Sequence, residues 1–261
     1  MAMSLYESVV KPLALMDHEV RFYREEGYLP LPGFVAAEHV AGLCEEVLQV
    51  LAAQGLPRER LGRTEDTKDK LRQFPQYLKG SRLDALINGS NTLVVAARLI
   101  GGRAIRYLPF TAVKTGGGGG QFHFHQDNNY TTHEPALGSI NIWVALVDMM
   151  PENGCLQVVP RSHLGGTLVS TVSGDGDTHR KVAADPEYFI PIRMRAGDAV
   201  AFTRLTVHGS GPNHSDEPRL AYGLQYHRED VKFRIAPTDD WKLLIENPRT
   251  QTPPLERLGK G

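Results

Sequence analysis

Cysteine is scarce in this sequence, and its scarcity limits the chemistry that the chain can perform. The 261 residues include only two cysteines, Cys44 and Cys155. Thiolate zinc sites, iron–sulfur clusters and disulfide scaffolds all need more thiols than this. We therefore expect both thiols to be free, as is usual in a reducing compartment.

The sequence also lacks a surplus of positive charge. Lys and Arg number 29 against 30 Asp and Glu, which gives a formal net charge of -1. Proteins that bind nucleic acid depend on excess basic charge to attract phosphates. The composition therefore predicts no nucleic-acid partner, and we expect a small molecule as the binding partner.

Long apolar runs are missing as well. No stretch approaches the roughly 18 apolar residues that a membrane span requires. Near the N-terminus, Lys11, Pro12 and Asp17 interrupt the apolar residues before they reach the length of a secretory signal. We expect a cytoplasmic protein without a membrane partner. The sequence leaves the oligomeric state open.

Histidine, in contrast, is plentiful in one part of the chain. Eight of the ten histidines lie between His123 and His227. The hydrophobic content of 41% is enough for one sizeable core. Imidazole is therefore the main candidate for metal binding or acid–base chemistry in the second half of the chain.

The first hundred residues carry helical patterns. Asp17 begins a predicted helix that ends at Gly27, and apolar residues repeat at three- and four-residue steps over 40–51. A third helix is predicted over 83–100. Residues 58–72 include ten charged side chains, which favours a solvated connection and leaves a mobile lid as the alternative.

Beyond Gly102 the pattern changes to short strands separated by Gly and Pro turns, which predicts an antiparallel sandwich or barrel. We expect one domain over residues 1–261. Its parts are a mainly helical segment (1–102) packed on the barrel, a β core (103–230) and an irregular C-terminal arm (231–261). The predicted strands are 104–110, 121–127, 140–147, 156–159, 189–194, 199–203, 206–209 and 220–227.

Five consecutive glycines occupy residues 116–120. A phosphate-binding loop would end in Lys and Ser or Thr at the start of a helix, whereas here Gln121 and a predicted strand follow. The glycines therefore predict a flexible hinge beside a functional site.

A metal-binding pattern follows the glycines. If residues 121–127 form a strand, His123, His125 and Asp127 project to the same face, because alternate residues of a strand share a face. The His-x-Asp pair alone is weak evidence. Ten histidines and fourteen aspartates in 261 residues produce roughly half an occurrence by chance.

Two other places in the chain show a similar pattern, and their context separates them from His125 and Asp127. His214-x-Asp216 lies in a turn-rich segment, and His227-x-Glu229 has no histidine after it. His208, on another predicted strand, is a candidate third ligand for the first pair. Two histidines and one carboxylate leave coordination positions open, as in non-heme Fe(II) oxygenases.

A longer series of motifs has a specific order and spacing, and it resembles the phytanoyl-CoA dioxygenase family of Fe(II)/2-oxoglutarate-dependent oxygenases over residues 17–230. The motifs are His125-Gln-Asp127, Asn141-Ile-Trp143 with Asp148, Glu152-Asn-Gly154-Cys-Leu156, Val159-Pro160-Arg-Ser162-His163, Gly197-Asp198, and His208-Gly-Ser-Gly-Pro-Asn213 with Arg219.

The resemblance implies a mainly β fold with flanking N-terminal α-helices. Its core would be a double-stranded β-helix, that is, a cupin-like jelly roll. Fe(II) would be held by His125, Asp127 and His208, and Arg219 would bind the distal carboxylate of 2-oxoglutarate. A buried dicarboxylate needs such a fixed bidentate cation. O2 would be the second cosubstrate.

Further residues are predicted to lie near the cosubstrate and the substrate. Lys114, Asn141 and Trp143 lie on strands expected to face the cavity, although Trp143 also suits the core. Four polar residues that follow the ligand strand are candidates for the substrate entrance. The charged segment 58–72 and the glycine-rich segment 164–181 are candidate lids over it. The four residues are Asn128, Asn129, Tyr130 and His133.

The remaining histidines are interpreted as structural or peripheral. His123 is either a group that supports the ligands or a core histidine. A structural role is expected for His163, a surface or structural role for His214 and His227, and helical positions for His18 and His39.

The resulting hypothesis is an Fe(II)- and 2-oxoglutarate-dependent dioxygenase that hydroxylates an aliphatic C–H bond of a small metabolite and releases succinate and CO2. In halogenating relatives a small residue replaces the carboxylate ligand, so Asp127 favours hydroxylation; desaturation and ring closure stay open. Two alternatives remain: a metal-dependent cupin enzyme that does not use 2-oxoglutarate, and a non-catalytic jelly roll that senses 2-oxoglutarate.

Overall fold

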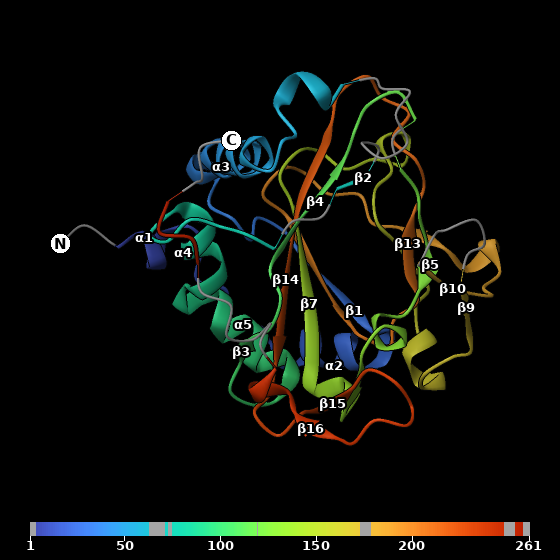
Figure 1. Ribbon diagram of the computed structural model, residues 1–261. Helices are drawn as coiled ribbons and strands as arrows, with labels where there is room; N and C mark the ends of the chain where they lie inside the picture. The colour runs from blue at the N-terminus through green and yellow to red at the C-terminus, as the bar shows by residue number, and fades with distance from the viewer. Residues whose placement is uncertain are drawn as a thin grey trace.

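The computed structural model is built around two main antiparallel sheets with a cavity between them, and helices cover the outer face of the larger sheet (Figure 1). The larger sheet has the order β1-β12-β7-β14-β4-β2, with β3 also paired to β14, and the smaller has the order β11-β8-β13-β5. This jelly roll confirms the predicted fold class. The structure describes residues 4–62, 71–72, 75–118, 120–172, 179–247 and 254–257.

The helices and strands have the following bounds. The helices are α1 (Leu5–Ser8), α2 (Asp17–Glu26), α3 (Ala37–Ala53), α4 (Arg82–Asn88) and α5 (Ser90–Ile100). The first strands are β1 (Tyr28–Leu31), β2 (Leu71–Arg72), β3 (Ile105–Arg106), β4 (Phe110–Lys114), β5 (Phe122–His125), β6 (Thr132–Glu134), β7 (Ser139–Ala145) and β8 (Gln157–Val158). The others are β9 (Ser170–Val172), β10 (Arg180–Val182), β11 (Ile190–Pro191), β12 (Ala199–Thr203), β13 (His208–Ser210), β14 (Arg219–His227), β15 (Lys232–Arg234) and β16 (Lys242–Leu243).

Strand β7 shows how the larger sheet separates the core from the cavity. Ile142 and Val144 point to the helices and join the main hydrophobic cluster, whereas Asn141 and Trp143 line the cavity. The alternation follows from the two-residue period of a strand. Because both faces are covered, every residue of β7 is buried.

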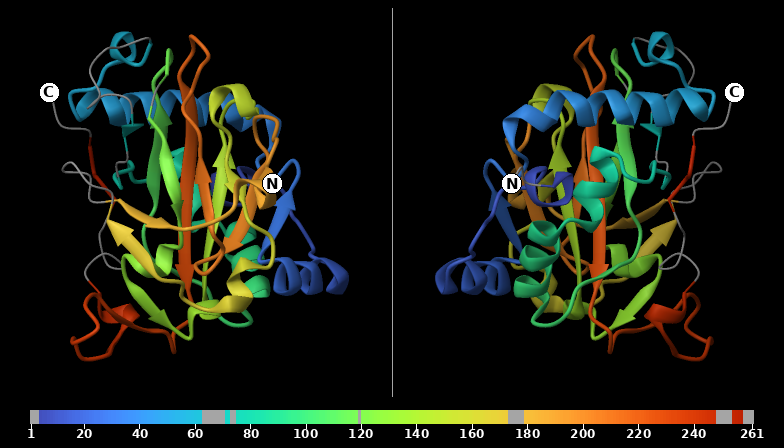
Figure 2. Two further views of the ribbon diagram at one scale, coloured as in Figure 1. Left: turned by 90° about the vertical axis from the view of Figure 1, so that its right-hand side faces the viewer. Right: turned by 90° about the vertical axis from the view of Figure 1, so that its left-hand side faces the viewer.

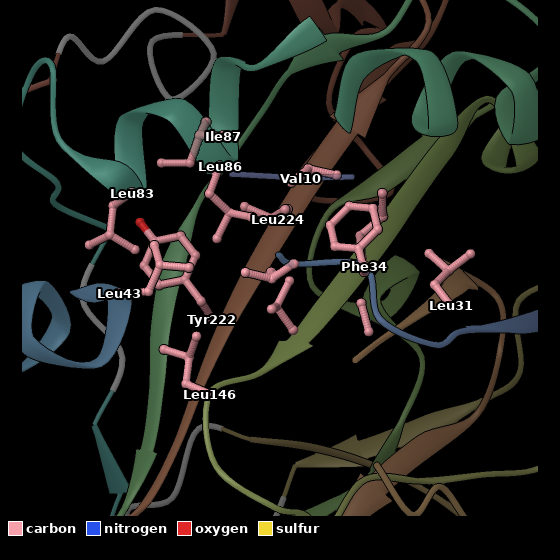
Figure 3. Close-up of a cluster of buried hydrophobic side chains, with 14 of the residues drawn as sticks. Val10, Leu31, Phe34, Leu43, Leu83, Leu86, Ile87, Leu146, Tyr222 and Leu224 are labelled. Carbon is pink, nitrogen blue, oxygen red and sulfur yellow. The ribbon is translucent and has the colours of Figure 1, made fainter. Parts of the chain in front are cut away.

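The opposite face of the same sheet packs against the helices. In Figure 3, Leu83 and Leu86 of α4 lie beside Tyr222 and Leu224 of β14, and all four are buried in one cluster. Burying each such side chain contributes about 1.5–3 kcal/mol. The long helix α3 crosses one end of the sheet (Figure 2). This layer holds the cavity-facing strands in place.

The helical predictions were right except at one break. Helices α2 and α3 occur where the pattern predicted them, but the single helix expected over 83–100 is divided into α4 and α5 at Gly89. Gly89 has extended backbone angles, and a Cβ there would collide with the carbonyl oxygens of Ala85 and Tyr6. Close packing of three segments, which periodicity does not reveal, causes the break.

The N-terminal and C-terminal segments contribute more strand than the sequence indicated. Strand β1 lies in the mainly helical segment but pairs with β12 at the edge of the larger sheet. Strands β15 and β16 form a small sheet with β6, so the expected irregular arm is wrong for residues 232–234 and 242–243. Among the described residues, no helix is both long and apolar enough to cross a membrane.

The predicted hinge and lids are only partly within the described residues. The backbone N–H groups of Gly116, Gly117 and Gly118 donate to the carbonyls of residues 61, 215 and 213. This part of the glycine run is therefore a bonded turn, and the hinge prediction is wrong for it. Gly119 and residues 63–70 and 173–178 of the two predicted lids lie outside the described residues, while β9 and β10 form a hairpin in the second.

Gly27 ends α2 with a left-handed backbone and lies against the segment that leads to β13. Its φ is +83°, and a Cβ there would overlap His163 Nδ1 and approach Thr206 Oγ1 within 2.8 Å. Thr206 Oγ1 donates to the Gly27 carbonyl over 2.6 Å. The glycine is needed both for its conformation and for this close approach.

Gly27→Ala is expected to destabilise the protein more than Gly55→Ala. Gly55 has a similar φ of +79° but open space around it, so its substitution costs only the left-handed strain of about 1–2 kcal/mol. Gly27→Ala should cost about 1–3 kcal/mol more, because the methyl group must displace His163 and Thr206. Urea unfolding of both variants measures the difference. Equal losses of unfolding free energy would show that His163 and Thr206 move aside without cost and would contradict this expectation.

Candidate metal centre

Two histidines face each other on neighbouring strands of the smaller sheet. His125 ends β5 and His208 begins β13, and the antiparallel register places the two residues directly opposite one another. Directly paired residues project to the same face of a sheet. Their ring centroids are 4.4 Å apart, and both side chains are largely buried.

Backbone carbonyls orient both imidazole rings. His125 Nδ1 donates to the carbonyl of His123 over 2.6 Å, and His208 Nδ1 donates to the carbonyl of Thr206 over 2.9 Å. With Nδ1 protonated, each Nε2 keeps a free lone pair, which is the state that binds a metal. His123 thus supports the ligand through its backbone. Its side chain is only half-buried, which excludes the predicted core position.

Asp127 reaches the same point from a turn. Strand β5 ends at His125, and residues Asp127–Asn129 form a 3-10 turn, so the expectation that Asp127 lies on the strand is wrong. Asn141 Nδ2 donates to Asp127 Oδ2 over 2.7 Å. Arg204 Nη2 donates to the Asp127 carbonyl over 2.9 Å. These two contacts fix the carboxylate and the turn that carries it.

The three side chains form a compact set of metal ligands. Asp127 Oδ1 is 3.4 Å from His125 Nε2 and 3.7 Å from His208 Nε2, and the ligand atoms all lie within 4.8 Å of one another. Neutral imidazoles and a carboxylate are the donor set for Fe(II) with open positions. Among the described residues, this is the one such group of histidine, cysteine or acidic side chains.

The protonation states suit metal binding at neutral pH. Burial and, secondarily, the adjacent His125 lower the pKa of His208 to about 4, so its imidazole is neutral above that pH. Burial alone would raise the pKa of Asp127, but His208, His125 and Arg204 together hold it well below its usual range. Asp127 and His208 therefore need not lose protons when a cation binds.

An inner cavity of about 70 Å³ extends from the triad to Arg219. Arg219 is 1% exposed, and its Nε and Nη1 have no hydrogen-bond partner among the described residues. Its guanidinium lies 4.9 Å from the ring centroid of Trp143, which also lines the cavity. Burial lowers the pKa of Arg219 to about 9, which still leaves it charged at neutral pH. A buried cation with free donors fits a carboxylate ligand.

Lys114 is a second buried basic residue beside the inner cavity. It pairs directly with Arg219 across β4 and β14, and its amine donates to Ser210 Oγ over 2.7 Å and to the Gly211 carbonyl. Burial, together with the neighbouring Arg219, lowers the pKa of Lys114 to about 6. The Lys114 amine is therefore neutral in the ligand-free protein at neutral pH. An anion that bound nearby would favour its protonated form.

Lys114→Met is expected to stabilise the ligand-free protein and to weaken its affinity for 2-oxoglutarate. Between pH 6 and 10.5 the unfolded chain keeps the lysine proton that the folded chain has lost, so stability rises with pH across this window. Methionine removes this pH dependence and should raise the free energy of unfolding by about 1–4 kcal/mol at neutral pH. Urea unfolding at several pH values tests this against Lys79→Met, an exposed lysine; an unchanged slope would contradict it.

A second, outer cavity of about 410 Å³ opens on the other side of the triad. Both cavities are lined by His125 and Asp127, so the candidate metal lies where they meet. The outer cavity has the size of small-molecule sites. Its other lining residues are Pro75, Tyr107, Leu108, Phe110, Phe122, Tyr130, Thr131, His179, Arg204 and Gln225.

Of the four predicted substrate residues, only Tyr130 lines this cavity. Asn128 is buried and accepts from the backbone N–H of His133 over 2.9 Å. Asn129 Nδ2 donates to the Leu168 carbonyl over 3.0 Å. His133 is fully buried beneath Tyr107. These three residues stabilise the loop after the ligands, which corrects their predicted place at the entrance.

The remaining histidines lie outside the triad, as expected. His163 Nε2 donates to the carbonyl of Arg24 and connects its turn to α2. His227 is buried at the end of β14, and His214 is exposed. His18 and His39 lie on α2 and α3.

Sequence reasoning missed Arg204 and the aromatic side chains that line both cavities, Phe110 and Phe122. One signal was present for Arg204. No other Lys, Arg, Asp or Glu occurs between Asp198 and Asp216, so this charge lies alone in an apolar segment. The aromatic residues gave no such signal, because apolar residues of any strand suit a core equally well.

Comparison with known proteins agrees with this geometry. A family model for phytanoyl-CoA dioxygenase (PhyH) matches residues 23–221. The mouse phytanoyl-CoA dioxygenase domain-containing protein 1 is 32% identical over 144 residues, which cover 52% of this chain and 48% of the mouse protein. This match thus spans about half the length of that relative. The methylphosphonate hydroxylase of Gimesia maris is 28% identical over 216 residues, covering 82% of this chain and 81% of that protein.

A solved structure gives the same result over nearly the whole chain. The non-heme alpha ketoglutarate dependent carbocyclase SnoK from nogalamycin biosynthesis has a TM-score of 0.67 and 26% sequence identity, and the match covers 95% of this chain and 94% of SnoK. Since the family model matches well over half of the sequence, this chain belongs to the phytanoyl-CoA dioxygenase family.

Proposed function

We propose that this protein is an Fe(II)- and 2-oxoglutarate-dependent oxygenase that hydroxylates an aliphatic C–H bond of a small metabolite. The observation that carries the proposal is the arrangement of the inner cavity. Three metal ligands line it together with Arg219, a buried cation with two unpartnered nitrogen atoms. A metal ligand that also carries a distal carboxylate satisfies both features at once.

The residues present fit both groups. His125, Asp127 and His208 would hold Fe(II), and Arg219 would bind the distal carboxylate of 2-oxoglutarate. Ser210, which lines the inner cavity and accepts from Lys114, lies two residues after His208. Arg219 and Lys114 have no acidic partner in the described part of the chain, so an anion would compensate the buried charge of Arg219 and favour the protonated form of Lys114.

With both groups bound, O2 and 2-oxoglutarate are converted to succinate and CO2 while one oxygen atom enters the substrate C–H bond. The chain contributes position and environment. Asn141 orients the Asp127 carboxylate, and the carbonyls of residues 123 and 206 orient the two imidazoles. Apolar walls formed by Trp143, Phe202 and Leu156 keep water away from the inner cavity.

The relatives support oxidation of a small substrate but differ in outcome. One is named for hydroxylation of methylphosphonate and another for ring closure in nogalamycin biosynthesis. The outer cavity of about 410 Å³ suits a metabolite of modest size. The carboxylate ligand Asp127 favours oxygen transfer, and we therefore propose hydroxylation.

Substrate-stimulated succinate release tests this function. The purified protein is supplied with Fe(II), 2-oxoglutarate and O2 and screened against a library of small metabolites. We expect at least one compound to raise succinate release above the background rate and to gain one oxygen atom by mass spectrometry. Iron and 2-oxoglutarate binding without succinate release from any compound would instead indicate a sensor.

A further inference from the structure

Arg204 is a buried cation whose guanidinium uses only some of its hydrogen-bond donors. It follows β12, is 4% exposed and lines the outer cavity. Its Nη2 donates to the carbonyls of Asp127 and Thr131 over 2.9 and 3.0 Å. Its Nε is buried and has no hydrogen-bond partner among the described residues. The guanidinium is therefore held in position by one nitrogen while another donor remains free.

The surroundings of Arg204 balance its charge only in part. In the part of the chain that the structure describes, no carboxylate lies within ion-pair distance of it. The Asp127 carboxylate favours the charged form of Arg204, but it also belongs to the metal ligands. His133 and His227 lie close by, and burial lowers the pKa of both, so they are neutral at pH 7. A buried arginine that shares its one stabilising carboxylate with a metal site gains from an external anion.

The rest of the outer cavity fits the body of such an anion. Aromatic side chains form much of its wall, Tyr107, Phe110 and Phe122 among them, and Thr131, His179 and Gln225 add polar groups. Apart from the metal ligand Asp127, no acidic side chain lines it among the residues that the structure describes. A partly apolar enclosure with one fixed cation favours a compact molecule that carries one anionic group.

We propose that Arg204 binds a carboxylate or phosphonate group of the substrate in the outer cavity and thereby holds the substrate beside the metal centre. Arg219 lines only the inner cavity and Arg204 only the outer, so each anion has its own arginine. The reaction of the bound anion rests on the proposed function. The binding of the anion does not depend on it.

Calorimetry with a matched pair of probes tests the proposal. The protein is loaded anaerobically with Fe(II) and saturated with 2-oxoglutarate, so that Arg219 is occupied. Cyclohexanecarboxylate and its neutral amide, cyclohexanecarboxamide, are then titrated separately. A charge-assisted hydrogen bond should make the acid bind about 10- to 100-fold more tightly than the amide. Equal binding of the two, or binding of neither, overturns the proposal. Cyclohexylphosphonate, titrated in parallel, shows which of the two anionic groups the arginine prefers.

Three variants assign the preference to Arg204. Arg204→Gln should abolish the preference for the acid, whereas Arg195→Gln, an exposed arginine before the same strand, should retain it. A preference that survives in Arg204→Gln overturns the proposal. Arg204→Lys keeps the charge but loses the planar fork, and it should lower the affinity for the acid while leaving that for the amide unchanged.

The iron state of each variant separates a local effect from a disturbed metal site. Visible absorption of the anaerobic Fe(II)–2-oxoglutarate complex should be retained in Arg204→Lys. Arg204→Gln could lose this absorption because the Asp127 turn has moved, and its binding data would then not be used. In that case the affinity of Arg204→Lys for the acid is the test, and an affinity equal to that of the wild-type protein overturns the proposal. If the wild-type protein shows no such absorption, the proposed function fails. The comparison of acid with amide on the metal-free protein then still tests Arg204.

Discussion

His208→Ala is expected to abolish Fe(II) binding and to lower turnover by on the order of 10³-fold or more. The same result is expected for His125→Ala and Asp127→Ala, because each removes one of three ligand atoms that lie within 4.8 Å of one another. Two remaining ligands hold a divalent cation weakly. Equilibrium dialysis with Fe(II) measures the loss directly.

His214→Ala is the matched control for the triad. His214 belongs to another His-x-Asp pair with Asp216, but it is exposed and lies outside the metal centre. Iron binding and turnover should be unchanged in this variant. If His214→Ala lost iron, or if one of the triad variants kept it, the ligand assignment would be wrong.

Arg219→Ala is expected to raise the concentration of 2-oxoglutarate required for half-maximal turnover by about 10- to 100-fold. The guanidinium is buried and lies over Trp143. Its two nitrogen atoms without a hydrogen-bond partner are suited to bind a carboxylate. Iron binding should stay intact, since Arg219 contacts none of the three metal ligands. Steady-state kinetics with varied 2-oxoglutarate, together with Fe(II) dialysis, checks both expectations.

Measuring both the 2-oxoglutarate requirement and Fe(II) binding of Arg219→Ala distinguishes a loss of cosubstrate binding from a general loss of structure. A misfolded variant would lose iron and 2-oxoglutarate together. An unchanged requirement for 2-oxoglutarate in Arg219→Ala would reject the assigned role and favour a metal enzyme that works without this cosubstrate.

The metal ligands could be predicted from sequence because a few residues carry the chemistry. His125, Asp127 and His208 are distinguished by residue type, and their pairing needs only the order of the strands. The structure shows the register that makes the prediction work, with His125 directly opposite His208. The turn at Asp127 was missed, because a strand pattern does not show where the chain leaves the sheet.

The two cavities could be predicted only in part. Asn141 and Trp143 were expected to face the cavity, and the alternation along β7 places them there. The hydrogen bond that Asn141 donates to the Asp127 carboxylate was not predicted, because it joins a strand to a turn elsewhere in the sequence. Arg204 was not predicted, because its environment is formed by residues far apart in the sequence. Burial without a counterion becomes visible only in three dimensions.

Buried basic residues without an ion pair of their own among the described residues recur on both sides of the candidate metal. Arg219 and Lys114 border the inner cavity, and Arg204 borders the outer. Each lowers the stability of the ligand-free protein and is compensated when an anion binds. We therefore expect 2-oxoglutarate to raise the melting temperature of the protein, and this rise should be smaller in Lys114→Met.

Visible absorption under anaerobic conditions tests the central claim most directly. The claim is that His125, Asp127 and His208 hold Fe(II) while 2-oxoglutarate binds to it from the inner cavity. A weak charge-transfer band should appear only when Fe(II) and 2-oxoglutarate are both present, and it should be absent from the three triad variants. A protein that binds Fe(II) yet shows no band at saturating 2-oxoglutarate would contradict the account.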